Sequence, residues 1–571
     1  MVEWKPEWMP ERRYHAFVLN EDDLKAYPCW YLDAAHSIPP WTPLFIWSWT
    51  HHQRYGDLWA AETMGLPTCR GTDWREVDGC AYMCPVLVTD EAEKRARSER
   101  FKQHLQSFVT RYNEIHDKVI LELNRSYDRF KAFNPDQAGL SELYDHFEQV
   151  FHFNYRVWGL HSWMLYTLFA FYSLFEDLCR EYAGINDTSP LWHRLIRGFD
   201  NKMLEVNRTL WKLAMDAAEQ GLDPLIKGTP DREVLNALEE NEAGRRWLHR
   251  ENGFYDFVRT HGWRMPRVME FNAPSIIERP EQLFPLIRHC FERPQGMEDE
   301  ASRAEIVRDR LDAEAEIISK FPPSERSWVR KLMELTQQTG IFAEGHNYYF
   351  EHTSHALMRR AALACAKRLV REGLMDDPED FVFLLPDDFR RNLLSLRINF
   401  RPLIEERKAY YRKYSLRTER PHLIGRLSDD PQKAMEYVLA ARDYVMLKLT
   451  VGSRTLISRD LKADLVGNPA APGLGQGRAC LVLDENDIAK IKDGDILVAV
   501  TTYSSWTPFF PLIRGIVLDS GASLSHAAIM GREHDIPVVV QTGEATKKLK
   551  DGQHIRIDGE RGAVWILEDG P

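Results

Sequence analysis

The chain has 571 residues, of which 44% are hydrophobic and 28% are charged. This is the composition of a globular protein, and the length suffices for roughly three to four domains. The 74 basic and 86 acidic residues give a net charge of −12, and no basic block stands out. Fibrous and wholly disordered classes are therefore excluded, and nucleic acid is not expected as the main partner.

Cysteine spacing and the N-terminus bear on the compartment. The eight cysteines form no CxxC pair, which favours a reduced, cytoplasmic setting over disulfides or structural zinc. Cys80 and Cys84 lie downstream of His51 and His52, but zinc ligands usually come in tighter pairs, and we expect no metal. The first residues are charged throughout and lack the apolar core of a signal peptide.

Residues 1–90 are rich in Pro, Trp and Gly, with short apolar runs such as Tyr82 to Val88 between turn signals. We expect a segment of irregular structure with a few strands. Tryptophan is concentrated at the front, because 15 of the 17 residues precede residue 330. The front therefore carries a large amount of rigid, amphipathic aromatic surface.

Helical spacing and mixed charge dominate from about Asp90 to about Leu447. The predicted helices are 91–123, 140–183, 189–220, 301–339, 352–372 and 430–449. The stretch from Val157 to Phe175 contains no Asp, Glu, Lys or Arg. It is short for a membrane span and includes polar residues, so we interpret it as a buried helix and expect no membrane association.

Beyond Ser458 the pattern changes to short β-rich runs separated by Gly and Asp turns. The predicted strands are 479–483, 496–499, 515–518, 537–540, 554–557 and 563–566. We therefore expect a multidomain α+β protein. Its parts are a Trp-rich, irregular N-terminal segment (1–90), a large mostly α-helical domain (91–455) and a C-terminal α/β domain (456–571).

The strongest local signal is residues 515–540, GIVLDSGASLSHAAIMGREHDIPVVV. It predicts a strand, a turn of small residues, a helix from about His526 to His534, and a strand. A serine is expected to cap the helix, and small neighbours are expected to leave His526 sterically open. A phosphoryl group on this imidazole would lie against the positive end of the helix dipole, and Arg532 could help to neutralise its charge. The alternative is a capping histidine on a surface turn.

These residues resemble the phosphohistidine mobile domain of phosphoenolpyruvate-utilising enzymes. The resemblance covers residues 464–567 and includes Ala471-Pro-Gly473 and Trp506-Thr-Pro508. It implies a swivelling domain in which His526 is the phosphorylated residue. Leu524 departs from the Thr or Asn that is usual two positions before this histidine, and we expect this change to loosen hydrogen bonding around the phosphoryl group.

The helical region resembles the rifampin phosphotransferases of the same family at two segments. One is residues 257–280 (FVRTHGWRMPRVMEFNAPSIIERP), and the other begins at Glu344. The resemblance implies catalytic roles for His261, Arg264 and Glu270, and substrate binding by Glu344, His346 and Arg359. In a phosphotransferase a His or Glu can accept a hydroxyl proton, and an Arg can bind phosphoryl oxygens. The alternative is that these are buried, paired residues that orient helices.

No GxxxxGK[ST] loop and no ATP-grasp sequence is recognisable in the chain. The resemblance therefore implies an ATP-grasp subunit that acts in trans with ATP and Mg²⁺, while this chain holds no cofactor tightly. The front, including Pro39-Pro-Trp-Thr-Pro-Leu44, resembles the histidine-bearing subunit of phenylphosphate synthases, which implies a small phenolic acceptor. We expect helix 151–175, with His161 and Trp163, to contribute to its binding site.

The sequence thus predicts one subunit of an ATP-dependent, dikinase-type phosphotransferase. His526 would receive a phosphoryl group from the partner and pass it to the hydroxyl of a small aromatic acceptor. Two alternatives remain open. The acceptor is pyruvate or a larger hydroxylated compound, or the chain is a non-catalytic phosphocarrier or regulatory protein whose helical region docks a partner.

Overall fold

The computed structural model describes residues 17–34, 36–186, 189–265, 269–292, 300–395, 398–417, 420–441, 461–483, 485–522 and 524–568. The chain forms two compact units. Unit 1 comprises Met1–Ala170, Met269–Asn272 and Tyr349–Leu447, and unit 2 comprises Phe171–Val268, Ala273–Tyr348 and Lys448–Pro571. The expected domain boundary at residue 455 and most of the expected swivel segment, 453–464, lie outside the described residues.

Unit 1 contains a four-stranded antiparallel sheet in the order β2-β3-β1-β4. Its strands are β1 (Trp30–Leu32), β2 (Cys69–Val77), β3 (Cys80–Leu87) and β4 (Leu423–Ile424). Asp78 and Gly79 connect β2 to β3 with φ angles of 53° and 75°. A two-residue hairpin turn of type I′ requires positive φ at both positions, which explains the Asp-Gly sequence at this point.

Helices also occupy part of the segment that we expected to be irregular. They are α1 (Glu21–Ala26), α2 (Pro43–Ser48), the π-helix η1 (Trp49–Gln53) and α3 (Arg54–Met64). The expectation of irregular structure is wrong for residues 43–64. Aromatic residues have weak helix propensity, but Phe45, Trp47 and Trp49 are buried here, and this packing outweighs the propensity.

The remaining helices of unit 1 follow the prediction more closely. They are α4 (Glu91–Lys131), the first part of α5 (Leu140–Ala183), most of η3 (Asn347–His352), α15 (Thr353–Arg371), η4 (Pro378–Phe383), α16 (Pro386–Ser395), α17 (Arg401–Ser415) and α18 (Pro431–Leu439). The unit boundary crosses η3, and the part of this helix from Tyr349 onward belongs to unit 1. The predicted helix 140–183 coincides with α5. The predicted helix 430–449 is described only as far as residue 441.

The helices of unit 2 are the end of α5, α6 (Pro190–Leu195), α7 (Lys202–Glu219), α8 (Asp223–Gly228), α9 (Asp231–Glu240), α10 (Glu242–His249), α11 (Phe254–His261), η2 (Pro280–Leu283), α12 (Phe284–Glu292), α13 (Glu300–Ser319) and α14 (Arg326–His346). Two predicted helices are broken. Gly198, with φ of 78°, interrupts 189–220, and Asn201 caps α7 by accepting the N–H of Leu204 at 3.0 Å. Pro322 and Pro323 lie between α13 and α14.

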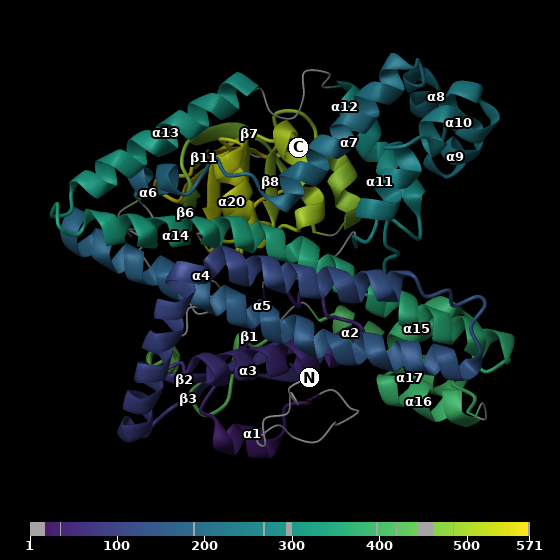
Figure 1. Cartoon of the computed structure of the whole chain (residues 1–571), viewed down its shortest axis with the longest axis horizontal. Helices are drawn as coiled ribbons and strands as arrows, with labels where there is room; N and C mark the ends of the chain where they lie inside the picture. The colour runs from purple at the N-terminus through teal and green to yellow at the C-terminus, as the bar shows by residue number, and fades with distance from the viewer. Residues whose placement is uncertain are drawn as a thin grey trace. The chain divides into compact units, whose positions relative to one another are not determined.

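The C-terminal part of unit 2 is an eight-stranded sheet in the order β5-β12-β11-β7-β8-β9-β10-β6 (Figure 1). Its strands are β5 (Leu465–Val466), β6 (Asn468–Ala471), β7 (Leu474–Leu481), β8 (Ile496–Ala499), β9 (Gly515–Leu518), β10 (Val538–Val540), β11 (His554–Asp558) and β12 (Ala563–Glu568). Strands β7 to β10 are parallel neighbours. Every residue of β8 and β9 is buried, as parallel strands covered on both faces require.

Short helices connect these strands: η5 (Glu485–Lys490), η6 (Ser504–Leu512), α20 (His526–Glu533) and α21 (Ala545–Lys548). The predicted strands and the predicted helix at His526 are all present. The α/β part packs on the helices of unit 2, because Leu204 of α7 belongs to the same buried apolar cluster as Trp506 and Phe510. His289 of α12 also stacks on Phe509, with ring centroids 6.1 Å apart.

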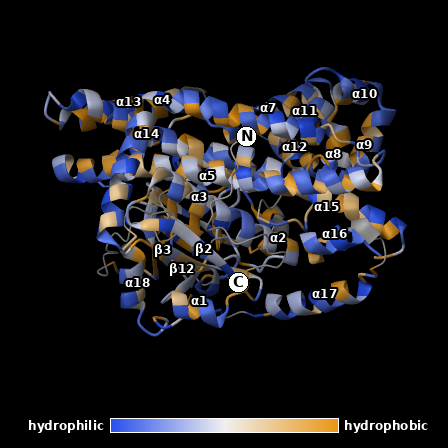
Figure 2. Cartoon of the chain, turned by 60° about the horizontal axis from the view of Figure 1, so that its bottom comes forward, coloured by the Kyte–Doolittle hydropathy of each residue, from blue (hydrophilic) through white to orange (hydrophobic). Residues whose placement is uncertain are grey.

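Among the described residues, no helix combines the length and the apolar character that crossing a membrane requires. Figure 2 shows hydrophilic and hydrophobic residues mixed along the labelled helices. The uncharged stretch of α5 from Val157 to Phe175 is mostly buried, and Val157, Leu168 and Phe175 have no exposed surface.

Candidate functional site

His526 is the first residue of α20 and follows a tightly built turn after β9. Gly521 in this turn has φ of 125°, a conformation available mainly to glycine. The hydroxyl of Ser520 donates to the carbonyl of Val500 at 2.9 Å, and the Asp519 carboxylate accepts the hydroxyl of Thr542 at 3.1 Å. These contacts fix the start of α20, and with it the position of His526.

The imidazole of His526 has a partner at each ring nitrogen. Nδ1 lies 2.9 Å from Oε2 of Glu344 in α14, and Nε2 lies 3.3 Å from the hydroxyl oxygen of Thr507 in η6. The ring of Phe510 is also close, with its centroid 5.7 Å from that of the imidazole. Only 9% of the His526 side chain is exposed. The expectation of a sterically open histidine is therefore wrong, because residues of α14 and η6 cover it.

The tautomer of His526 follows from these partners. An ionised carboxylate can only accept, so Nδ1 carries the hydrogen and donates it to Glu344. The lone pair of Nε2 then faces the hydroxyl of Thr507, which can donate to it. The arrangement leaves a lone pair on Nε2 at the N-terminal end of a helix, where backbone N–H groups favour negative charge.

The predicted serine cap of α20 is wrong in its detail. Ser525 occupies the N-cap position, but its hydroxyl makes no capping hydrogen bond. The hydroxyl oxygen is buried without a partner among the described residues. It lies close to Gly521, where an added Cβ atom would be only 3.2 Å away.

Arg532 lies near the end of α20 and is 2% exposed. Its Nη1 donates to the backbone carbonyl of Ala470 in β6 at 2.6 Å. This contact connects α20 to the edge of the sheet. Neutralisation of a phosphoryl group by Arg532 stays a prediction.

The next residue, Glu533, is a contact that the sequence reasoning missed. Its carboxylate accepts the backbone N–H of Gly198 at 3.0 Å and that of Phe199 at 3.4 Å, and it pairs with Arg303 of α13 at 2.8 Å. Burial raises the pKa of Glu533, although Arg303 and the two N–H donors oppose that shift. Asp535, two residues on, pairs with Arg197 at 2.6 Å. Both ends of α20 are therefore attached to the helical part of unit 2.

His261 and Arg264 lie together at the end of α11. Nδ1 of His261 is 3.2 Å from the hydroxyl of Tyr348, and Nε of Arg264 donates to the carbonyl of His261 at 3.2 Å. Burial lowers the pKa of Arg264 to about 10. No carboxylate pairs with this guanidinium in the part of the chain that the structure describes. Tyr348 follows Glu344 by one turn of the same continuous helix.

Glu270 and Arg359, by contrast, have structural partners in unit 1. Glu270 accepts the hydroxyl of Thr42 at 2.6 Å and its N–H at 2.8 Å, as well as the N–H of Phe271. Arg359 donates to the carbonyl of Phe271 at 2.6 Å and forms a bidentate pair with Glu379 at 2.9 Å. Both residues are fully buried. They fit the alternative reading, in which buried polar residues orient the backbone.

The three remaining candidates are His161, Trp163 and His346. His161 packs on Trp158 and Phe350 in unit 1, at centroid distances of 4.8 and 5.8 Å. Trp163, two residues along α5, packs on α4 instead. His346 belongs to unit 2, where its Nδ1 lies 3.3 Å from the carbonyl of Phe342. Residues two positions apart in a helix point to different faces, so His161 and Trp163 do not line one surface.

The tryptophans of unit 1 form a connected aromatic cluster. The ring centroid of Trp49 lies 5.0 Å from that of Trp41 and 5.3 Å from that of Trp158. The ring centroids of Phe45 and Phe271 are 5.0 Å apart. The indole N–H groups of Trp41 and Trp49 are buried and have no acceptor among the described residues. Buried donors are normally satisfied, so these two groups mark a place where an acceptor oxygen would be stabilised.

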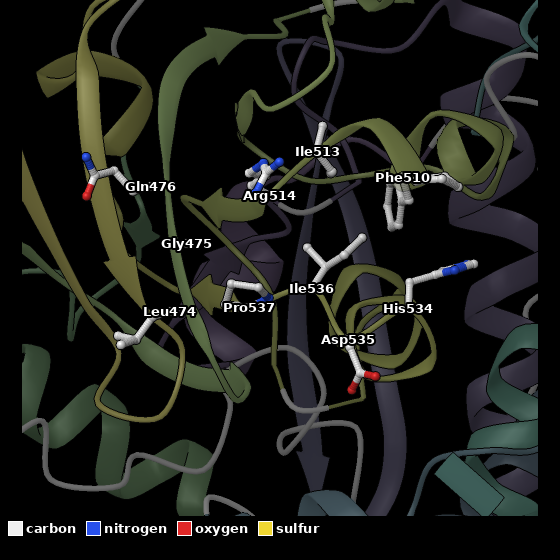
Figure 3. A pocket seen from close by; sticks show the side chains of 11 residues that line it. Leu474, Gly475, Gln476, Phe510, Ile513, Arg514, His534, Asp535, Ile536 and Pro537 are labelled. Atoms are coloured by element: carbon white, nitrogen blue, oxygen red, sulfur yellow. The ribbon is translucent and has the colours of Figure 1, made fainter. Parts of the chain in front are cut away.

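A pocket of about 550 Å³ opens on the α/β part of unit 2, beside Phe510 (Figure 3). Its polar lining groups include Arg514, His534 and Asp535, and Figure 3 shows them around the opening. Phe510 separates the pocket from His526, and Asp535 is held by Arg197. The pocket therefore lies at the edge of the interface that carries His526.

Two family models match separate parts of the chain. Residues 491–562 match the mobile domain of PEP-utilising enzymes, and this range includes His526, Thr507 and Glu533. Residues 161–343 match the fourth domain of rifampicin phosphotransferase, which ends one residue before Glu344. Of the two residues in the closest polar contact, His526 lies within the first matched range, and Glu344 directly follows the second.

The chain is also similar to several individual proteins. Chondramide synthase cmdD of Chondromyces crocatus is 29% identical over 72% of this chain and 10% of its own length. Rifampicin phosphotransferase of Bacillus subtilis is 25% identical over 60% of this chain and 37% of its own length. A probable phosphoenolpyruvate synthase of Pyrococcus abyssi is 40% identical over 23% of this chain and 16% of its own length. The chain spans less than half of each of these relatives.

Proposed function

We propose that the chain is a phosphotransferase component with a phosphohistidine intermediate, because separate parts of it match the mobile domain of PEP-utilising enzymes and the fourth domain of rifampicin phosphotransferase. His526 accepts a phosphoryl group and passes it to a hydroxyl group. One observation carries this proposal: His526 begins α20 with Nδ1 held by Glu344 and with Nε2 facing the hydroxyl of Thr507.

The geometry suits phosphoryl transfer through Nε2. The N-terminal end of α20 favours the negative charge of the phosphoryl group. Such transfer depends on in-line placement and charge neutralisation more than on covalent chemistry from the surrounding residues. Arg264 supports the second requirement, because its buried guanidinium has no carboxylate partner among the described residues and lies next to Tyr348, one turn from Glu344. We assign phosphoryl binding to Arg264, and His261 keeps its proposed catalytic role beside it.

The phosphoryl donor in this proposal is ATP with Mg²⁺, bound by a separate ATP-grasp subunit. The α/β domain would carry the phosphoryl group between the partner and the acceptor. We further propose a cytoplasmic protein that works as one subunit of a complex.

The acceptor we favour is a small phenolic alcohol. The aromatic cluster of unit 1 supports it, since the unsatisfied N–H groups of Trp41 and Trp49 could donate to an acceptor oxygen beside aromatic surface. A larger hydroxylated compound is the second candidate, and it is supported by the relatives named rifampicin phosphotransferase. Pyruvate is a third, supported by the relatives named phosphoenolpyruvate synthase.

The full chain can be tested without its partner. Phosphoramidate is a small chemical donor that phosphorylates accessible histidines, and ³¹P NMR detects the product. We expect an acid-labile signal in the wild type that is missing from His526→Ala. Adding phenol should convert the signal to phenyl phosphate, with pyruvate and rifampicin as comparison acceptors. An unphosphorylated wild type would overturn the proposal, and phosphorylation without transfer to any acceptor would leave the phosphocarrier alternative.

A further inference from the structure

Glu344 is a buried carboxylate with one polar partner. Its side chain is 1% exposed, and Oε2 accepts from His526 at 2.9 Å. Oε1 is buried and has no hydrogen-bond partner among the described residues. A carboxylate that only stabilised the fold would normally have donors at both oxygens, because a buried charge is costly unless it is paired and hydrogen-bonded.

Glu533 shows what such a structural carboxylate looks like in the same interface. It is similarly buried, but two backbone N–H groups and Arg303 satisfy its oxygens. Glu344 lacks this set of donors. The position of Glu344 is therefore better explained by its hydrogen bond with Nδ1 of His526 than by a contribution to packing.

The geometry also excludes Glu344 as the base for the acceptor. Nδ1 and Nε2 lie on different edges of the imidazole ring, and Glu344 is at the Nδ1 edge. An acceptor hydroxyl attacks phosphorus from the side opposite the breaking Nε2–P bond, beyond the phosphoryl group. Glu344 thus contacts the leaving group and not the nucleophile, which revises the substrate-binding role expected from the sequence.

We propose that Glu344 is a positioning residue that holds the Nδ1 proton on phosphorylated His526, so that the imidazole leaves as a neutral group. This rests on the proposed function. In the transfer step the Nε2–P bond breaks and its electron pair stays on Nε2, while the acceptor oxygen forms the new P–O bond. The hydroxyl proton passes to a base or to solvent, and the Nδ1 proton stays in place. Without that proton the leaving group would be an imidazolide anion.

The contact also links reactivity to the position of the domain. His526 belongs to the α/β part, whereas Glu344 belongs to α14 of the helical part. Glu344 can support the Nδ1 proton only while α20 lies on α14. The phosphoryl group is then activated where an acceptor is present and is less reactive while the domain is elsewhere.

The experiment uses the full chain labelled with ¹⁵N-histidine and compares wild type, Glu344→Gln and Glu544→Gln. The His526 resonances are assigned by their absence in His526→Ala. In unphosphorylated wild type we expect the ¹⁵N pattern of an imidazole with its hydrogen on Nδ1. Glu344→Gln should shift that pattern, whereas Glu544→Gln, an exposed change in the same domain, should leave it unchanged.

A second measurement follows the phosphorylated proteins. After treatment with phosphoramidate, transfer to phenol should be about 10- to 100-fold slower in Glu344→Gln than in wild type, the range for loss of a charge-assisted hydrogen bond. An unchanged His526 spectrum in Glu344→Gln, or a transfer rate within twofold of wild type, would refute the inference. The spectrum needs no phosphorylation, so it tests Glu344 even if the proposed function fails. Circular dichroism confirms that each variant is folded.

Discussion

Each carboxylate oxygen of Glu533 lies 3.0 Å from the backbone nitrogen of Gly198, which donates its hydrogen to the pair. Gly198 has φ of 78° in the loop between α6 and α7. This loop conformation turns its N–H groups toward the end of α20. This hydrogen bond connects the α/β part to the helical part of unit 2. Because the donor is a backbone N–H group, the contact depends on the backbone conformation of the loop and not on its side chains.

Removing this anchor should weaken docking without affecting the histidine itself. In Glu533→Ala we expect transfer from phosphorylated His526 to slow by about 10-fold, since hydrogen bonds to a charged group are lost. Phosphorylation of His526 by phosphoramidate should be retained. Amide hydrogen exchange of residues 196–201 should increase. Glu544→Gln, an exposed change in the same domain, is the control, and equal transfer rates in both variants would contradict the role of Glu533.

Arg264 and Arg359 are both buried, but we expect Arg264 to act in phosphoryl transfer and Arg359 to stabilise the fold. Arg264→Met is expected to slow transfer by about 10- to 100-fold, because a charge-assisted contact to the phosphoryl group is lost. Stability should be unchanged or higher, since an uncompensated buried charge is removed. Transfer and urea unfolding are measured on the same preparations.

Arg359→Met should behave in the opposite way. It leaves the buried carbonyl of Phe271 without its donor, which costs about 1–3 kcal/mol of stability. Its transfer rate should change less than that of Arg264→Met. A larger loss of stability in Arg264→Met than in Arg359→Met would reverse the assignment of the two residues.

Labelling from ATP offers a direct test of the nucleophile. With a candidate ATP-grasp subunit and γ- or β-labelled ATP, the wild type should acquire acid-labile label. His526→Ala should acquire none, while His534→Gln, at the other end of α20, should be labelled. Label that persists in His526→Ala would place the phosphoryl group on another residue.

Asp57 predicts a pH dependence of stability in unit 1. Burial raises its pKa from 3.8 to about 6, although hydrogen bonds from Tyr166, Trp74 and Ser162 oppose this. Between pH of about 4 and about 6 the folded protein therefore retains a proton that the unfolded chain has lost. Stability should fall as the pH rises through this window, by about 3 kcal/mol for a shift of roughly two units.

The measurement compares Asp57→Asn with the wild type by urea unfolding, followed by tryptophan fluorescence. The stability of the wild type relative to the variant should decrease from pH 4 to pH 6 and be constant above about pH 7. A difference that is independent of pH would show that Asp57 ionises normally.

Much of the α/β part was predictable from the sequence because its signals are local. The predicted strands 496–499 and 515–518 coincide with β8 and β9, and the helix at His526 begins where it was expected. Short apolar runs between Gly and Asp turns define such strands without reference to the rest of the chain. The same holds for α5, whose apolar spacing continues over its whole length.

The contacts of the site were not predictable in this way. Glu344 and His526 are 182 residues apart, and Glu533 and Gly198 are 335 residues apart. A single sequence contains no signal that pairs such positions. The serine cap also failed, because Ser525 occupies the expected N-cap position but its hydroxyl makes no capping hydrogen bond. Helices α2 and α3 were missed because packing of aromatic residues, and not their propensity, stabilises them.

The eight residues of α20 have a consequence for how the enzyme would change state. One end of this helix bears the reactive histidine and the other bears Glu533, and an intact helix of this length is a short rigid rod. Its two ends cannot leave their partners independently. Loss of either contact should therefore release both, so that the carrier is either fully engaged or fully detached, with no half-open form in which activated phosphate meets water.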